Sequence, residues 1–243
     1  MRITRLYHPE NLICGQTIHL DANTSSHLIR VLRTKSDTEI ILFNGDGFDY
    51  SCKTLDINPK NTLVSIESST QANNESSLKT TLIQGMSRHD RMDQTIQKSV
   101  ELGVNRIIPV LCQRSNTKLP KDKQAKKLAH WKKVVISACE QSGRSILPEV
   151  TEVITITNIE QWLDQDAFKI ALNPEAKISL NDISTNHKSV EIFIGPEGGF
   201  TDEELTLLET LHFKSIRFGP RILRTETTGP AVISALQLLW GDF

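Results

Sequence analysis

Residues 190–200 read Val-Glu-Ile-Phe-Ile-Gly-Pro-Glu-Gly-Gly-Phe, an apolar strand that runs directly into a glycine-rich loop. Thr201 and Glu204 follow with the spacing of a capping box, which predicts a helix over residues 202–211. The adjacent glycines allow the loop backbone to approach a ligand closely and to adopt positive φ. A buried strand, a tight loop and a helix in this order are typical of a parallel α/β sheet.

The same alternation of strand and helix extends to both sides of this stretch. The expected strands cover residues 80–83, 104–111, 169–172, 190–194 and 215–218. The expected helices cover residues 90–102, 121–141, 202–211 and 231–240. Gly103 is a good stop for the first of these helices. This part of the chain is therefore predicted to be a parallel sheet with helices on both faces.

The N-terminal part has a different pattern. Short strands are expected at residues 38–43, 48–57 and 62–68, with the turn residues Asn-Gly-Asp-Gly at 44–47. One short helix is expected at residues 25–33. Residues 69–78 are polar and small and are predicted to be a linker. We therefore expect a small β-barrel over residues 1–72 and an α/β domain over residues 73–243.

The charge is unevenly distributed, although the net charge of the chain is only -1. Residues 79–150 hold 14 basic and 6 acidic side chains, whereas residues 151–243 hold 7 and 14. A basic block on an otherwise acidic protein favours a polyanionic partner, because contacts with phosphates supply most of the sequence-independent affinity for nucleic acids. A solvated helix rich in lysine is the alternative explanation.

Several common classes of protein lack their signatures here. The sequence has no GxGxxG, GxxxxGK[ST], GxSxG or HExxH motif. Its four cysteines form no CxxC pair, so neither a disulfide framework nor a metal site is expected. No apolar run reaches the length of about 18 residues that a membrane span needs, and no secretory signal begins the chain. We therefore expect a soluble cytoplasmic protein that binds neither a membrane nor a metal.

Ligands of parallel α/β sheets bind at the carboxyl ends of the strands, where three loops stand out. These loops cover residues 173–176, 195–200 and 219–227. The third places Arg221 and Arg224 beside Glu226, close to the expected start of the last helix at residues 229–230. Cations oppose the dipole of a helix N-terminus, so this placement favours a bound anion such as a phosphate. Alternatively, Glu226 pairs with one arginine and the neighbouring threonines cap the helix.

Residues 194–200 together with residues 218–227 resemble the ribosomal RNA small subunit methyltransferase E family, which belongs to the SPOUT superfamily. The likeness extends to residues 27–33, which resemble the N-terminal signature of the family. In the middle of the chain it is carried by Gln97, Lys98, residues 101–104, Arg114, Ser115, Glu140, Gln141, Arg144 and Pro148. Thr228-Gly229-Pro230 departs from the plainer helix start of many relatives.

The resemblance implies a PUA-like RNA-binding β-barrel followed by a SPOUT domain with a deep C-terminal trefoil knot. It implies a homodimer that uses S-adenosyl-L-methionine to methylate N3 of a uridine in 16S rRNA of the small ribosomal subunit. The cofactor pocket is expected to be lined by Leu172, Gly195, Pro196, Glu197, Gly198, Phe218, Gly219, Ile222 and Leu223. The expected catalytic residues are Arg221, Arg224 and Glu226. The residues expected to contact RNA are His27, Arg30, Arg33, Arg88, Lys98, Arg114 and Arg144.

Methyl transfer from a sulfonium requires an in-line nucleophile and needs neither a metal nor a covalent enzyme intermediate. Uridine N3 carries a proton and lies on the Watson–Crick edge, so the base has to be unpaired and deprotonated. Our hypothesis is that Arg221 or Arg224 stabilises the developing charge or holds a phosphate, whereas a carboxylate paired with arginine is a weak base. The alternatives are a 2′-O-ribose SPOUT methyltransferase, a non-catalytic RNA-binding assembly factor and a structural dimer without RNA.

Overall fold

The computed structural model of the protein describes residues 3–88, 90–116, 119–183 and 186–243, and the chain forms two compact units. The first unit contains Met1–Glu75 and Cys139–Leu147, and the second contains Ser76–Ala138 and Pro148–Phe243. The boundary expected after residue 72 falls three residues further along, and the segment 139–147 joins the first unit, which the sequence did not indicate. Among the described residues, no helix is long and apolar enough to cross a membrane.

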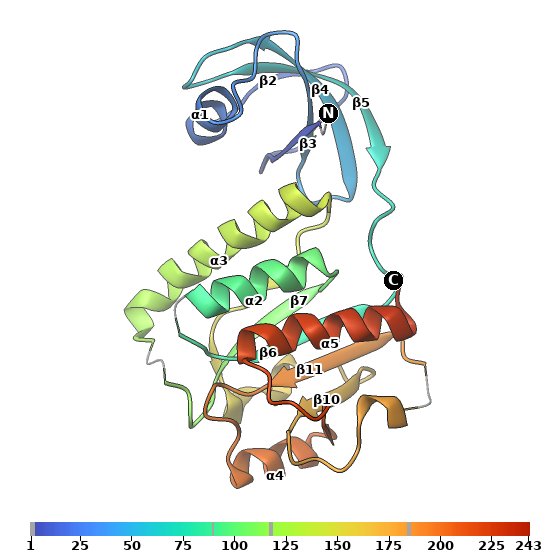
Figure 1. The fold of residues 1–243 in the computed structure, drawn as a ribbon. Coiled ribbons are helices and arrows are strands. Elements are labelled where there is room, and N and C mark those ends of the chain that lie inside the picture. The colour runs from blue at the N-terminus through green and yellow to red at the C-terminus, as the bar shows by residue number, and fades with distance from the viewer. Residues whose placement is uncertain (1–2, 89, 117–118, 184–185) are drawn as a thin grey trace. The chain divides into compact units, whose positions relative to one another are not determined.

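The first unit is a five-stranded sheet with one helix (Figure 1). Its elements are β1 (Thr4–Tyr7), β2 (Thr17–His19), α1 (Ala22–Arg30), β3 (Glu39–Phe43), β4 (Phe48–Asp56) and β5 (Leu63–Gln71). The strand order is β1-β3-β4-β5-β2, with β1 parallel to β3 and the other pairs antiparallel. Leu28 of α1 is fully buried in the same core as Leu42 and Val64. This unit is the expected small β domain, with two short strands, β1 and β2, that the sequence did not reveal.

Two boundaries in this unit differ from the sequence-based prediction. Helix α1 begins three residues earlier than residue 25, because the Asp21 side chain caps it by accepting hydrogen bonds from the backbone N–H groups of Asn23 and Thr24. Arg33 lies beyond its end in the left-handed region, at φ 53°. Strand β5 runs into the expected linker, where its exposed polar residues 69–71 still pair with β4. Exposure, rather than the absence of a strand, explains the polar composition there.

The second unit is a sheet with helices on both faces, as the sequence predicts. Its elements are β6 (Lys79–Gly85), α2 (Asp90–Glu101), β7 (Arg106–Leu111), α3 (Lys121–Ser142, whose last residues belong to the first unit), β8 (Glu149–Val150), β9 (Ile154–Thr155), η1 (Ile156–Asn158), η2 (Glu160–Trp162), β10 (Phe168–Leu172), η3 (Leu180–Asp182), β11 (Ser189–Ile194), α4 (Asp202–Thr210), β12 (Lys214–Ile216) and α5 (Thr225–Trp240). The strand order is β12-β10-β11-β6-β7-β8, with β9 beside β7, and the pairs are parallel. Short strands β8 and β9 and the three 3₁₀ turns were not expected.

Helices α2 and α5 pack against each other over one face of this sheet (Figure 1). Gly229 of α5 is buried at this contact, where a Cβ would meet Ile194, Leu82 and Thr95 side-chain carbons at an ordinary 3.5 Å. The opposite face is covered by a second apolar cluster that includes Phe193 and Leu208. With both faces buried, the ends of the strands are the natural place for a ligand.

The start of the last helix was predicted wrongly. It was expected after Pro230, but α5 begins at Thr225 and contains Pro230 as its sixth residue. Proline has no N–H to donate to the carbonyl of Glu226, so it removes one helical hydrogen bond. Gly229 precedes it and has no Cβ, which relieves the usual steric conflict before a proline. The earlier start brings Arg224 to the helix N-terminus.

Candidate functional site

The three loops singled out in the sequence meet at the carboxyl ends of β10, β11 and β12 and line one cavity of about 1120 Å³. Residues 172–175, 216–225 and most of 194–200 form its walls, and Arg91 and Arg114 enter from the connections after β6 and β7. Because neighbouring strands are parallel, their carboxyl ends share one edge of the sheet, and β10 lies between β11 and β12. The site is thus built from segments far apart in the sequence.

The glycine-rich loop after β11 rests directly on the end of β6. A Cβ on Gly85 would lie 2.5 Å from the backbone nitrogen of Pro196 and 2.8 Å from the carbonyl carbon of Gly195. Only a glycine therefore fits at the end of β6 without moving the loop backbone. Phe200 covers the other side, with its ring 5.0 Å from that of Phe193 in an edge-to-face arrangement.

Arg114 holds the far end of the same loop. Its Nη1 donates to the carbonyl oxygens of Gly198, at 3.3 Å, and Phe200, at 2.9 Å. Gly198 is required for this approach, since a Cβ there would lie 2.8 Å from the Cβ of Arg114. An arginine expected to contact RNA is thus part of the support of the loop.

The predicted capping box of α4 is present. The Thr201 hydroxyl accepts from the N–H of Glu204, and Glu204 Oε2 accepts from the N–H of Thr201 at 2.9 Å. Glu204 Oε1 also accepts from the N–H of Gln113, at 2.8 Å, which ties the start of α4 to the end of β7. Hydrogen bonds from its own backbone and from Thr201 hold the pKa of Glu203 below its usual value.

Two carboxylates at the cavity share one arginine. Arg91 Nη1 donates to Glu197 Oε1 at 3.0 Å, and Arg91 Nε lies 3.7 Å from Glu226 Oε1. Arg224 Nη1 approaches the same Glu226 oxygen more loosely, at 4.0 Å. Sequence reasoning missed Arg91, although its place at the start of the helix that follows β6 puts it at the edge where the three loops meet.

The loop after β12 is exposed rather than packed. Ile222 is 86% exposed, and the side chain of Arg224 is 78% exposed. Arg224 is the N-cap of α5 in extended conformation, and its side chain makes no capping hydrogen bond. Two arginines near the positive end of a helix dipole form a place where an anion is favoured.

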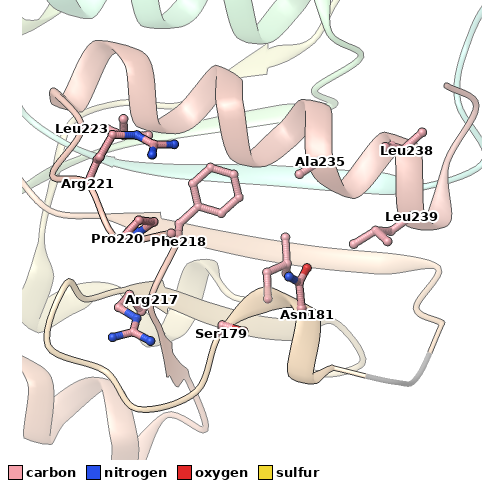
Figure 2. A pocket seen from close by; sticks show the side chains of 12 residues that line it. Ser179, Asn181, Arg217, Phe218, Pro220, Arg221, Leu223, Ala235, Leu238 and Leu239 are labelled. Carbon is pink, nitrogen blue, oxygen red and sulfur yellow. The ribbon is translucent and has the colours of Figure 1, made fainter.

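A second hollow of about 540 Å³ lies on the other side of this loop, against α5. Figure 2 shows the Phe218 ring between the loop and α5, with Leu238 and Leu239 further along the helix. These two leucines are 69% and 50% exposed. The segment 217–223 therefore separates two cavities, one polar at its rim and one bordered by exposed leucines.

The expected cofactor residues gather at the first cavity. Those that line it are Leu172, Gly195, Pro196, Glu197, Phe218, Gly219, Ile222 and Leu223. Gly198 is not among the lining residues and acts through its contact with Arg114. Arg221 and Arg224 line the cavity, and Glu226 lies behind them against Arg91.

The residues expected to contact RNA have different surroundings. In the first unit, His27 and Arg30 are exposed in the last turn of α1, and Arg33 is exposed just after it. In the second unit, Arg88 is exposed and Lys98 forms an ion pair with Glu101 on its own helix. Arg144 is only 3% exposed, and its Nε donates to Glu75 Oε1 at 2.8 Å, which favours a structural role over RNA contact.

Two features of the cavity suit a bound cofactor. Gly195, Gly199 and Gly219 line it with bare backbone, which lets a ligand approach closely. Glu197 Oε2 is buried and has no hydrogen-bond partner among the described residues, so an acceptor is available for a donor group of a ligand. Among the same residues, no group of three or more His, Cys, Asp or Glu side chains could hold a metal.

Comparisons with known proteins define the class first. Residues 74–237 match the RNA methyltransferase domain family, and residues 20–67 match the RNA methyltransferase PUA domain family. The fold is therefore that of a PUA-like domain joined to a SPOUT-type parallel α/β methyltransferase domain.

Individual relatives define the family. Ribosomal RNA small subunit methyltransferase E from Buchnera aphidicola (strain Sg) is 35% identical over 99% of this chain and 98% of its own length. The crystal structure of the same enzyme from Neisseria gonorrhoeae bound to S-adenosyl methionine has a TM-score of 0.93 and 39% identity, with full coverage of both chains. A putative methyltransferase from Legionella pneumophila in complex with S-adenosyl methionine has a TM-score of 0.95 and 35% identity, also with full coverage. The chain belongs to the ribosomal RNA small subunit methyltransferase E family.

Proposed function

We propose that this protein transfers a methyl group from S-adenosyl-L-methionine to N3 of one uridine in 16S rRNA. The observation that carries the proposal is the cavity at the carboxyl ends of β10, β11 and β12, where a rigid glycine loop faces exposed arginines. Two relatives of the same fold, at 39% and 35% identity, are described as bound to S-adenosyl methionine.

In this proposal the cofactor supplies an electrophilic methyl group on a sulfonium, and the protein positions the acceptor. The backbone of residues 195–199 and the segment 218–223 bind and orient the cofactor between them. Leu172, Ile194 and Phe200 exclude water from its apolar parts. Positioning of this kind brings the reacting atoms to near-attack distance, which accounts for much of the rate.

Arg221 and Arg224 face the target uridine. Their guanidinium groups hold a phosphate of the RNA or stabilise negative charge that develops on the uracil oxygens when N3 loses its proton to solvent water. Glu226 Oε1 lies within 4.0 Å of both Arg91 and Arg224, so the carboxylate is better suited to hold arginines than to accept a proton. The N3 edge is free only in an unpaired or flipped base, so the exposed rim of the cavity is the place where the base enters.

We propose a homodimer as the active form. Exposed leucines on α5 and the second cavity form an apolar face that a second copy would cover. The exposed basic residues of α1 in the first unit, and separately Arg88 in the second unit, are proposed as further RNA contacts. The trefoil knot of the C-terminal segment stays a prediction. Leu238→Glu is expected to yield monomers in sedimentation velocity, whereas an unchanged sedimentation coefficient for this variant would contradict the proposed face.

The direct test uses small ribosomal subunits that lack the modification, the purified protein and S-adenosyl-L-methionine, followed by primer extension along the 16S rRNA. A methyl group on N3 blocks Watson–Crick pairing, so we expect one new, cofactor-dependent stop at a uridine. Methyl incorporation without a stop would assign the chemistry to a ribose 2′-OH. Absence of incorporation into both subunits and naked rRNA, with RNA still bound, would assign the protein to the assembly factors.

A further inference from the structure

Arg91 stands out because it is charged, lines the cavity and belongs to neither of the two signature loops. It is the second residue of α2, where a positive charge opposes the helix dipole. Its side chain is 40% exposed and reaches both Glu197 and Glu226. An unfavourable helix position that bridges two carboxylates from different elements calls for an explanation.

The two carboxylates need a counter-ion. Glu197 belongs to the glycine-rich loop and Glu226 to the first turn of α5, and their side chains are only 19% and 14% exposed. Two partly buried negative charges at one cavity repel each other unless a cation lies between them. Arg91 meets this need with two different nitrogens, Nη1 toward Glu197 and Nε toward Glu226, so both contacts exist together.

The two oxygens of Glu226 have different neighbours. Oε2 accepts a hydrogen bond from the Thr225 hydroxyl at 3.3 Å. Oε1 is approached by Arg91 at 3.7 Å and by Arg224 at 4.0 Å. Arg91 and Arg224 therefore compete for one oxygen, and the tighter contact belongs to Arg91. Without Arg91, Arg224 would be the remaining cation beside Glu226 in this part of the described structure.

We infer that Arg91 is a positioning residue, which neutralises Glu226 and so keeps the exposed guanidinium of Arg224 available for RNA. The inference rests on the proposed function and goes beyond it, because it assigns a role to a side chain that touches neither the acceptor base nor a reacting atom. The loop contact of Arg91 is secondary to this role. Glu197 Oε1 also accepts from the N–H of Arg88, at 3.4 Å, and the loop is further held by Arg114 and the Gly85 contact.

The test is a double-mutant cycle with Arg91→Ala, Glu226→Gln and the double variant. The primary measurement is the affinity for small subunits that lack the modification, determined over a range of salt concentrations, because it does not depend on the chemical step. We expect Arg91→Ala to weaken binding about tenfold and to reduce the slope of log K against log salt by about one. The reason is that Arg224 then pairs with Glu226, so that one cation fewer contacts the RNA. In the double variant, the affinity should lie within about threefold of the affinity of Glu226→Gln alone, and the salt slope should return to that of Glu226→Gln. Such coupling is typical of residues that contact each other.

Two further variants and two further measurements separate this role from a loss of fold or of cofactor binding. Arg91→Lys should restore part of the affinity, since a lysine keeps one positive charge near Glu226. Lys188→Ala removes one exposed cation near the start of β11, at the opposite edge of the sheet, and is the matched control for charge. The melting temperature and the affinity for S-adenosyl-L-methionine should change little in Arg91→Ala, because the cofactor loop keeps its other supports.

Failure of the inference is distinct from failure of the proposed function. If Glu226→Gln does not rescue Arg91→Ala, Arg91 contacts RNA directly or serves the fold, and the inference is wrong. A melting temperature that falls in step with affinity would likewise overturn it. If the wild-type protein binds the subunits but incorporates no methyl group, the proposed function fails, while the coupling between Arg91 and Glu226 is still measurable from RNA affinity.

Discussion

The two loops that face each other across the cavity are built in opposite ways. The loop after β11 is packed on Gly85, hydrogen-bonded by Arg114 and continued into a helix by a complete capping box. The loop after β12 leaves Arg221, Ile222 and Arg224 exposed. We call the loop after β11 the packed wall and the loop after β12 the exposed wall. The packed wall is formed before ligands bind and suits a cofactor that binds in every catalytic cycle, because preorganisation reduces the cost of binding. The exposed wall presents cations and suits a large polyanion such as RNA.

The largest expected effect comes from the exposed wall. Arg224→Ala should reduce methyl transfer by about 10²- to 10³-fold, the usual cost of removing one charge-stabilising group. The affinity for S-adenosyl-L-methionine should stay within about threefold of wild type, because Arg224 belongs to the RNA side of the cavity. Radiolabelled methyl transfer and calorimetric titration measure the two effects, with Lys188→Ala as the control. Loss of cofactor binding would contradict this division of labour.

A substitution that disturbs the packed wall should instead lower the affinity for the cofactor. Gly85→Ala places a Cβ 2.5 Å from the Pro196 backbone nitrogen, so the loop has to move. Overpacking of this kind costs about 1–3 kcal/mol, and we expect cofactor affinity to fall about 10- to 100-fold. Lys188→Ala is the control, since this exposed residue lies before β11 and outside the cavity. Equal cofactor affinity in the Gly85 variant and its control would show that the loop is not rigid.

A smaller effect is expected from Gly198→Ala. The added methyl group meets the Cβ of Arg114 at 2.8 Å and its carbonyl oxygen at 3.1 Å. Arg114 lies in an exposed turn after β7, which can shift more easily than the buried end of β6, so we expect a loss of about three- to tenfold in cofactor affinity. The double variant Gly198→Ala with Arg114→Gly should cost less than the sum of the two single changes, because a glycine at position 114 removes the Cβ that the added methyl group meets. Strict additivity in calorimetric titrations would contradict this contact.

The smallest effect on activity is expected outside both walls, at Asp93 of α2. Burial opposes ionisation there, but hydrogen bonds from His130 and Lys127 outweigh it and hold the pKa of Asp93 below its usual value. Such a group stabilises the fold above its unfolded pKa of 3.8, and this contribution is lost as the pH falls through the folded pKa.

Asp93→Asn should therefore lower the stability by about 1 kcal/mol at pH 7 and leave the cofactor affinity unchanged. Urea unfolding at pH 7 and below pH 4 measures the change. A destabilisation that persists unaltered in acid would mean that the carboxylate charge is not its cause.

Much of the fold follows from local pattern. The apolar strand, the glycine loop and the capping box around residue 195 are all contiguous in the sequence, so each could be predicted. Features that depend on distant contacts could not. The segment 139–147 belongs to the first unit, and α5 continues through Pro230, a residue that in the sequence marks a helix start.

The candidate site likewise contains residues that sequence motifs indicate and residues whose roles depend on distant contacts. Two motifs indicated the facing loops, because loops that follow parallel strands meet at one edge. The role of Gly85 depends on a contact between residues more than 100 positions apart, and the sequence marks Gly85 only as a glycine that ends a strand. Arg91 was missed for a related reason, since its partners Glu197 and Glu226 come from other elements. Arg144 has the residue type of an RNA contact, but burial against Glu75 favours a structural role.

Amide hydrogen exchange with and without S-adenosyl-L-methionine tests the contrast between the two walls most directly. We predict that residues 195–200 are already protected in the free protein and change little when the cofactor binds. Residues 217–224 should exchange quickly in the free protein and become protected with the cofactor, and further with RNA. Fast exchange at residues 195–200 until the cofactor is added, with residues 217–224 protected throughout, would contradict the account.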